Sequence, residues 1–376
     1  MEGTVLLVLS MSVVLLLLLS KLIKSLLVAK PKHNMPPGPW TVPVIGNLHN
    51  VITGPNIHRA MRRLSRKHGP LMSLRLGEVA AVVVSSPEAV QEVMKAHDIA
   101  FSDRHRVLRA GGHVLACRKR IQRILEQIIQ ETKDAGTESE CFVSVLLRLQ
   151  KERSTPIPLD DETIMAVMFD MFAAGSETSS TTLIWCMTEL VRNPDVMARA
   201  QAEVREAFKG KNTITEQDLK GLRYLRLVIK EALRLHTPAP LLVPRKCRET
   251  CQVMDYDVPK GTAVFVNMWA ICRDPKYWDD PEEFKPQRFD NSDLDYKGTN
   301  YEFLPFGAGR RICPGINLGV GNIELALASL VYHFDWKLPD GIEPKDVDIF
   351  EAAGLVASKK TSLMVHPVTR IPPANV

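Results

Sequence analysis

The stretch FLPFGAGRRICPGINLG, residues 303–319, restricts the fold and chemistry of this chain more than any other. It places one cysteine, Cys313, among glycines and just after Arg310 and Arg311. The glycines permit a tight backbone, and Pro314 can begin the helix that follows. Backbone N–H groups at a helix start and nearby arginines stabilise a thiolate over a thiol. The sequence therefore predicts a loop that holds a sulfur anion.

The surroundings of Cys313 distinguish between two uses of such an anion. A cysteine nucleophile needs a histidine base, and no histidine lies near Cys313 in the sequence. A thiolate ligand of haem iron needs no base, and its electron donation favours cleavage of an O–O bond. The nearby arginine can clamp a haem propionate through two parallel hydrogen bonds. These features favour a haem ligand.

The remaining cysteines and the overall charge exclude other classes of site. Of the seven cysteines only Cys247 and Cys251 are close together, and no downstream cysteine or histidine pair completes a zinc site. The odd number of cysteines and their irregular spacing indicate a protein of a reducing compartment rather than a disulfide scaffold. The formal net charge of +5 is mildly basic, without the dense lysine or arginine tract typical of nucleic-acid binding.

An uncharged apolar run, residues 3–20, precedes a group of lysines at 21, 24, 30 and 32. It is long enough to cross a hydrocarbon layer of roughly 30 Å as a helix. A cleaved signal peptide is the alternative, but the charges lie on the wrong side of the run. By the positive-inside rule the body faces the cytosol. We therefore expect a membrane anchor at 1–30, a proline-rich hinge at 31–50 and one body at 51–376.

Hydrophobic periodicity in the body predicts mainly helix with small β elements. A long helix should begin after Asp160 or Asp161 and end before Pro194, and another should follow Pro314. Further elements are expected as follows: a hairpin over about 71–86, helices over about 118–132 and 219–236, and a strand pair over about 251–272 that turns at 259–261.

The centre of the long predicted helix, FAAGSETSSTT at 172–182, contains several residues of low helix propensity. Gly175 costs about 1 kcal/mol against alanine, and the hydroxyl residues compete for backbone hydrogen bonds. Such a conflict is typical of a functional site, where Glu177 and Thr178 would suit proton transfer into a pocket. A simple bend, or hydroxyls bonded to the preceding turn, explains the pattern equally well.

Glu231 is the one acid in the basic helix LKGLRYLRLVIKEALRLH. It falls beside the apolar arc of the helical wheel, with Arg234 at i+3 within reach. Arg288 in the segment PQRF can complete a buried cluster whose disruption would strand a charge.

These segments together resemble the cytochrome P-450 family. FGAGRRICPG is similar to its haem-binding signature, matched at Phe306, Gly309, Arg311, Cys313 and Gly315. AGSETS resembles its oxygen-activation motif, and Glu231 to Arg234 with Pro286 to Phe289 resemble its E-x-x-R and P-x-R-F motifs. The anchor and hinge resemble microsomal members, and the details resemble plant members that oxidise terpenoids and other specialised metabolites.

The resemblance implies a role for each matched residue. Cys313 would ligate the iron of haem b, and Arg311 and Arg245 would hold the propionates. Glu177 and Thr178 would deliver protons, and Glu231, Arg234 and Arg288 would be scaffold. Electrons would come from NADPH through a cytochrome P-450 reductase, at the cytosolic face of the endoplasmic reticulum. The pocket walls would include Ala174, Leu241, Leu242, Leu355 and Val356.

The sequence departs from the family between about residues 105 and 117. FSDR at 101–104 and RKRIQRILEQII at 118–129 look like the two sides of a region that normally holds several more helices. We interpret this as an internal deletion that weakens haem retention and opens the distal face. A truncated, non-catalytic form that binds haem poorly or competes for the reductase is therefore an alternative to the monooxygenase. A reductase-independent isomerase is disfavoured, because such enzymes do not need the Glu177–Thr178 pair.

Overall fold

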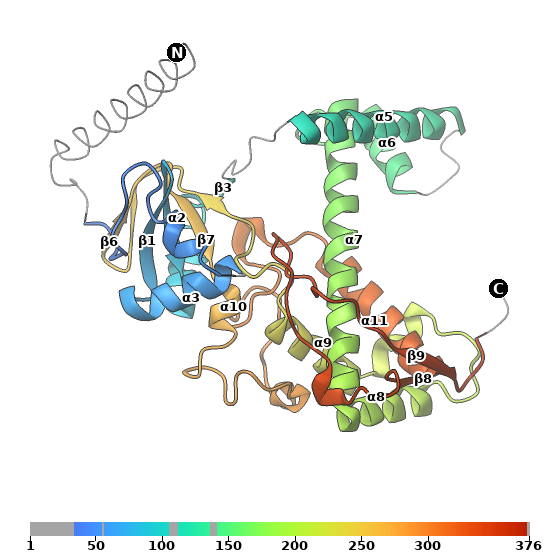
Figure 1. Cartoon of the computed structure of the whole chain (residues 1–376). Coiled ribbons are helices and arrows are strands. Elements are labelled where there is room, and N and C mark those ends of the chain that lie inside the picture. The colour runs from blue at the N-terminus through green and yellow to red at the C-terminus, as the bar shows by residue number, and fades with distance from the viewer. Residues whose placement is uncertain (1–33, 55, 105–111, 136–140, 374–376) are drawn as a thin grey trace, which may run out of the picture.

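The computed structural model describes residues 34–54, 56–104, 112–135 and 141–373. The predicted anchor lies outside these residues. Within the ranges that are described, no helix is both long and apolar enough to span a bilayer. The described chain divides into a sheet region and a larger helical region, which lie side by side (Figure 1).

The sheet region is built on five strands in the order β1-β2-β7-β4-β3. The strands are β1 (Leu71–Leu76), β2 (Val79–Val84), β3 (Asp103–Arg104), β4 (Arg245–Lys246) and β7 (Ala263–Val266). The predicted hairpin is confirmed as β1 and β2, which turn at residues 77–78. Helices α2 (Leu48–Val51), α3 (Ile57–His68) and α10 (Met268–Ile271) accompany this sheet. A small core that includes Met61 and Met72 joins α3 to the strands.

Helix α7 (Asp161–Arg192) runs through the whole helical region (Figure 1). It begins as predicted, because the Asp160 carboxylate accepts the Thr163 N–H at 2.7 Å, and it ends before Pro194. Its lower half packs against α8 (Pro194–Ala207), α9 (Tyr224–Leu235) and α11 (Ile316–His333). The main hydrophobic core lies among these helices and extends to the sheet.

The upper half of α7 carries a separate small bundle with α5 (Gly112–Ala135) and α6 (Phe142–Glu152). Its core consists of four buried residues, Ile129, Leu146, Ile164 and Met168. Figure 1 shows α5 lying across the end of α7, away from the sheet.

Short elements complete the description. Helix α4 (Pro87–Gln91) starts on the Ser86 cap and continues as the π-helix η1 (Glu92–Ala96). The 3-10 segments are η2 (Glu216–Gly221), η3 (Pro286–Phe289), η4 (Gly309–Arg311) and η5 (Pro344–Asp346). Strands β8 (Phe334–Lys337) and β9 (His366–Thr369) form a two-stranded antiparallel sheet.

Two predicted boundaries were wrong. The helix expected from about residue 219 begins at Tyr224, because 216–221 form the separate 3-10 segment η2. The strand pair expected to turn at 259–261 is instead β5 (Cys251–Val253) with β6 (Tyr256–Val258), turning at Met254 and Asp255. Both turn residues adopt positive φ without glycine, so the sequence carries no ordinary turn signal there. The turn at Gly261 leads into β7 of the larger sheet.

Candidate active site

Cys313 lies where the sequence places it, in a tight loop before α11. The Cys313 N–H donates to the Phe306 carbonyl at 2.9 Å, and the Ile312 N–H donates to the Gly309 carbonyl at 3.0 Å. Helix α11 then starts at Ile316. These bonds fix the loop backbone, and the Cys313 side chain is left partly exposed.

Only glycine fits at position 309, because of its backbone conformation and because neighbouring atoms leave no room for a side chain. Its φ is +65°, and a Cβ at this position would lie 2.5 Å from the Met94 carbonyl oxygen and 2.6 Å from an Asp98 carboxylate oxygen. Asp98 accepts the Arg310 N–H at 3.1 Å and pairs with Arg310 Nε at 3.2 Å. The loop is therefore braced against the segment that follows η1.

Three arginines gather beside this loop. Arg104 of β3 and Arg245 of β4 are direct partners in the antiparallel ladder, so their side chains share one face of the sheet. Arg311 donates from Nε to the Ser102 carbonyl at 2.6 Å, which holds it near the same strand. Partial burial and the neighbouring charge of Arg311 lower the pKa of Arg104. Arg245 and Arg311 were predicted from the sequence as residues of this site, but Arg104 was not.

Arg245 is buried and only partly satisfied. Its Nη2 donates to the Ala308 carbonyl at 2.7 Å, and its Nη1 lies 3.7 Å from Asp98 as an ion pair. That Nη1 has no hydrogen-bond partner within the described part of the chain, although it is inaccessible to solvent. Burial lowers the pKa of Arg245 to about 10, so it remains charged at neutral pH. A buried cation with a free donor fits an anionic ligand.

Glu177 and Thr178 lie in the middle of α7, which is continuous through them. The Thr178 hydroxyl donates to the Ala174 carbonyl at 2.6 Å, and the Ser180 hydroxyl donates to the Glu177 carbonyl at 3.0 Å. The hydroxyls are thus satisfied by the preceding turn, as the simpler interpretation expected. Glu177 is exposed, and a Cβ on Gly175 would meet no atom within 4 Å. This face of the helix is open.

Helix α11, which follows the Cys313 loop, packs against the centre of α7. A Cβ on Gly319 of α11 would lie 3.7 Å from the Ser179 hydroxyl oxygen, one residue from Thr178. The cysteine loop and the Glu177–Thr178 pair therefore belong to one region of the molecule, as the family resemblance implies.

The predicted pocket residues fall into two groups. Leu242 is buried with a positive φ of 50°, and its Cδ1 lies 3.9 Å from the position of a Cβ on Gly307 in the cysteine loop. Leu241 packs partly against the core of the sheet region. Ala174 and Leu355 are exposed, Leu355 to 68%, and Val356 is half-buried. Ala174 and Leu355 therefore lie on an open face, as the predicted internal deletion implies, rather than in closed pocket walls.

The segment carrying Leu355 and Val356 is nevertheless fixed to the site. The Ala357 N–H donates to the Pro238 carbonyl at 2.8 Å, and its carbonyl accepts the Trp185 indole N–H of α7 at 2.8 Å. His236 stacks on the Trp185 ring with centroids 4.0 Å apart. These contacts connect α7, the loop after α9 and the 354–357 turn.

Glu231, Arg234 and Arg288 form a buried cluster. Glu231 and Arg234 are fully buried and make two hydrogen bonds of 2.7 and 2.9 Å, and Arg288 Nε donates to Glu231 at 2.9 Å. Arg234 also donates to the carbonyls of Cys272, Pro281 and Glu283. The cluster fastens α9 to η3 and to the segment before it.

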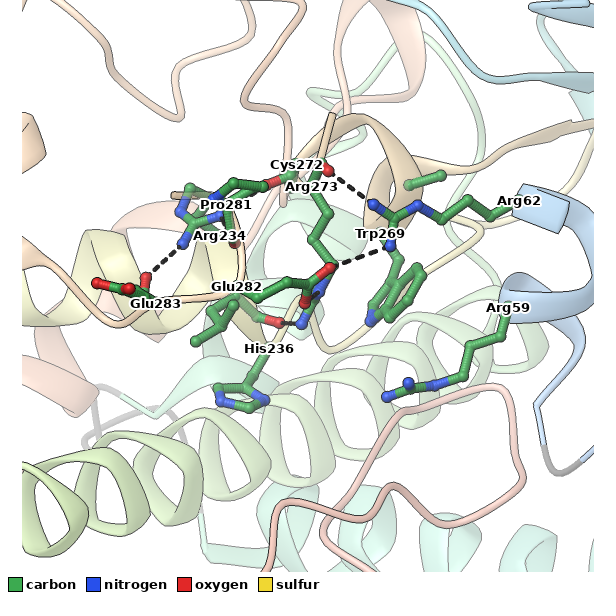
Figure 2. A network of polar contacts seen from close by, with 12 residues as sticks. Arg59, Arg62, Arg234, His236, Trp269, Cys272, Arg273, Pro281, Glu282 and Glu283 are labelled. Carbon is green, nitrogen blue, oxygen red and sulfur yellow. Dashed lines mark hydrogen bonds and ion pairs between the residues drawn. The ribbon is translucent and has the colours of Figure 1, made fainter. Parts of the chain in front are cut away.

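A second polar network continues from this cluster towards α3 (Figure 2). Arg62 and Arg273 both bind Glu282 at 3.1 Å, and their guanidinium groups lie over the Trp269 ring at 5.2 and 4.2 Å. The Trp269 indole N–H donates to Glu351 at 3.0 Å, and His58 and Arg59 contact the same carboxylate at 3.0 Å. The network binds the sheet region to the helical region.

A hollow of about 430 Å³ opens beside Cys313. It is lined by Tyr296 and Lys297 on one side, and by Pro314 and the first turns of α11 on the other. The sulfur-bearing loop is therefore reachable from this side as well.

The cytochrome P450 family model matches residues 36–112 and 108–365. The chain belongs to the cytochrome P450 family. The resemblance predicted from the sequence is thereby confirmed. The two matched stretches meet at residues 108–112, where the predicted internal deletion lies.

Curated plant relatives align over nearly their whole length. Zealexin A1 synthase of Zea mays is 50% identical over 93% of this chain and 95% of the relative. Dolabradiene monooxygenase of Zea mays is 48% identical over all of both chains, and ent-cassadiene hydroxylase of Oryza sativa subsp. japonica is 46% identical over 96% of each. Relatives named as monooxygenases and hydroxylases favour the enzyme over the non-catalytic alternative.

The alignment lengths carry a second finding. The alignment with dolabradiene monooxygenase has 507 positions, which exceeds the 376 residues of this chain by 131. Those positions hold residues of the relative without counterparts here. This excess is what an internal deletion produces.

The residues of the site fit the haem that the family implies. The sulfur of Cys313 is accessible, Gly175 leaves space on α7, and Arg104, Arg245 and Arg311 converge with one unused buried donor. Arg104 and Asp98 were missed from the sequence, because nothing in their own segments marks them. The pairing of β3 with β4 reveals Arg104, and the contact of η1 with η4 reveals Asp98.

Proposed function

We propose that this chain is a haem-thiolate monooxygenase that oxidises an apolar plant terpenoid. The observation that carries the proposal is the partly exposed Cys313 beside a cluster of three arginines, one of which has a buried donor without a hydrogen-bond partner among the described residues. When bound, the haem supplies activation of dioxygen, one atom of which enters the substrate.

The proposed division of roles follows the geometry. Cys313 provides the thiolate ligand, and its loop is held by backbone bonds rather than by its own side chain. Arg245, Arg311 and Arg104 hold the propionates. Phe306 and Gly315 shape the backbone on either side of the sulfur.

Glu177 and Thr178 would carry protons from solvent into the cofactor pocket. Support comes from the exposure of Glu177 and from the orientation of the Thr178 hydroxyl. This hydroxyl donates its hydrogen to the Ala174 carbonyl at 2.6 Å. That hydroxyl presents its lone pairs to a proton donor. Glu231, Arg234 and Arg288 act as scaffold.

The substrate is held against apolar side chains on the open face. Ala174, Leu241, Leu242, Leu355 and Val356 would contribute, and the exposed Phe172 of α7, 77% accessible, extends this surface. The substrate class follows from relatives whose names refer to diterpenes and related hydrocarbons, such as dolabradiene monooxygenase and ent-cassadiene hydroxylase.

The anchor and the reductase complete the proposal. Residues 1–30 anchor the chain in the endoplasmic reticulum, with the body in the cytosol and NADPH–cytochrome P450 reductase as electron donor. Asn34 is bonded to Asp257 at 2.8 Å and to the Asp255 carbonyl at 3.0 Å, which would fix the body at the end of the anchor. Trp40 nearby is 75% exposed, as suits a residue at a membrane surface.

The experiment is reconstitution of the full chain with haem, the reductase and NADPH. We expect sesquiterpene or diterpene hydrocarbons to shift the haem spin state and to gain one atom of labelled dioxygen. Binding of the reductase without product would support the competing, non-catalytic form instead. Absence of a thiolate spectrum would contradict the monooxygenase.

A further inference from the structure

The outer side of α5 carries an uncovered apolar stripe. Ile121, Ile124 and Ile128 are spaced i, i+3 and i+7, and they are 37%, 51% and 37% exposed. Residues at this spacing lie on one face of a helix. The adjacent face of α5 carries Leu125 and Ile129, which pack in the core shared with α6 and α7. Three isoleucines in one exposed row indicate a surface made for contact.

The bundle that carries this stripe buries little of its own apolar surface. Its core has four buried residues, and Phe142 of α6 and Phe169 of α7 are also exposed, to 46% and 42%. Figure 1 shows α5 across the end of α7, away from the sheet region, so the body of the chain does not cover it. A further surface is needed to cover the stripe.

The charges along α5 indicate which surface fits. Lys119, Arg120 and Arg123 precede the centre of the stripe, and Glu126, Glu131 and Asp134 follow it. None of these six forms a salt bridge with any residue that the structure describes. The acids accept only from glutamines of the same helix, at 2.7 to 2.8 Å.

We propose that α5 pairs in antiparallel orientation with α5 of a second copy of this chain. Antiparallel pairing sets Ile124 against Ile128 of the second copy, and Ile121 near Glu131. It also brings Arg120 towards Asp134 of the second copy, twice by symmetry. Basic residues lie at one end of the stripe and most of the acidic residues at the other, so an antiparallel second copy can pair with both ends, whereas an anionic membrane can pair only with the basic end.

The interface is small and should be weak. One helix face from each copy lies at the low end of specific interfaces, for which micromolar dissociation constants of roughly 1–100 µM are expected. The pairing does not depend on haem or on the proposed oxidation, and it can fail or succeed independently of them.

The test is sedimentation equilibrium of the full chain in detergent, with density matching of the micelle. We expect a concentration-dependent dimer. Ile124→Ser, at an exposed position, should weaken it at least roughly tenfold while leaving the helical circular dichroism unchanged. Arg120→Glu should weaken it roughly tenfold, and the double variant R120E/D134R should restore it.

The controls identify other outcomes. Lys337→Glu, an exposed charge change in β8, should leave the dimer intact. A dimer that Ile124→Ser does not weaken would overturn the proposal and assign association to the membrane anchor. A monomer at all concentrations that binds a full-length relative, or lipid vesicles, through the stripe would overturn it equally.

Discussion

Arg104 and Arg245 lie directly opposite each other across the β3–β4 pair, with the side chains on the same face of the sheet. Like charges in this position destabilise a sheet unless an anion lies between them. Among the residues that the structure describes, Asp98 forms ion pairs with Arg245 and Arg310 but not with Arg104. We propose that the propionates of the haem supply the missing negative charge, which would tie haem binding to the edge strand β3.

Replacement of Arg245 by methionine should weaken haem binding. The variant loses a buried donor to a charged group, worth about 1.5–3 kcal/mol, and the haem dissociation constant should rise roughly 10–100-fold. Haem titration followed by absorbance measures this constant. Arg248→Met, which removes an exposed arginine further along the same segment, is the control and should leave the constant within about twofold. Equal effects would exclude Arg245 from the propionate site.

Replacement of Thr178 by alanine should reduce product formation at least about tenfold, because proton delivery contributes on this scale or above it. The haem spectrum and the unfolding midpoint should stay close to those of the unmodified chain, since its hydroxyl bonds only within α7. Ser180→Ala, which removes a hydroxyl bonded to the Glu177 carbonyl of the same helix, is the matched control. Product per NADPH consumed is the measurement, and an unaffected ratio in T178A would contradict the role.

Replacement of Glu231 by glutamine should destabilise the fold by about 3–5 kcal/mol, because Arg234 and Arg288 would be left without their buried counter-charge. Urea unfolding of the full chain measures the change. Glu324→Gln removes the carboxylate of a partly exposed pair with Arg226 and should cost within about 1 kcal/mol. Similar losses in the two variants would show that burial of the cluster adds nothing.

The Glu351 carboxylate should contribute pH-dependent stability. Contacts with His58, Arg59 and Arg273 outweigh burial and lower its pKa from 4.5 to about 2. A lowered acid pKa stabilises the fold above the unfolded value, and this contribution, about 3 kcal/mol, is lost as the pH falls from 4.5 towards 2. Thermal unfolding of the full chain and of Glu351→Gln between pH 2 and 7 should converge at the acid end. Parallel curves across that window would refute the assignment.

Local signals predicted the parts of this structure that depend on neighbouring residues. Asp160 caps α7 and Pro314 precedes α11, because each boundary is decided within one turn of helix. The i, i+3 spacing likewise predicted the pair of Glu231 and Arg234. In each case the deciding contact lies within a few residues.

Other features depend on segments far apart in the chain. Arg104 meets Arg245 only because β3 pairs with β4, and Asp98 reaches Gly309 only because η1 packs on the cysteine loop. The open pocket face at Leu355 depends on which segments are absent from its surroundings. The turn at Met254 and Asp255 was missed because a glycine-free positive φ has no clear sequence signal.

The central claim is that the ionised sulfur of Cys313 binds the haem iron. The most direct measurement is the carbon-monoxide difference spectrum of the full chain beside that of Cys313→Ser, both expressed with haem supplied. We predict the thiolate band in the unmodified chain and its loss in the serine variant. An identical spectrum with equal haem content in the two proteins would contradict the account.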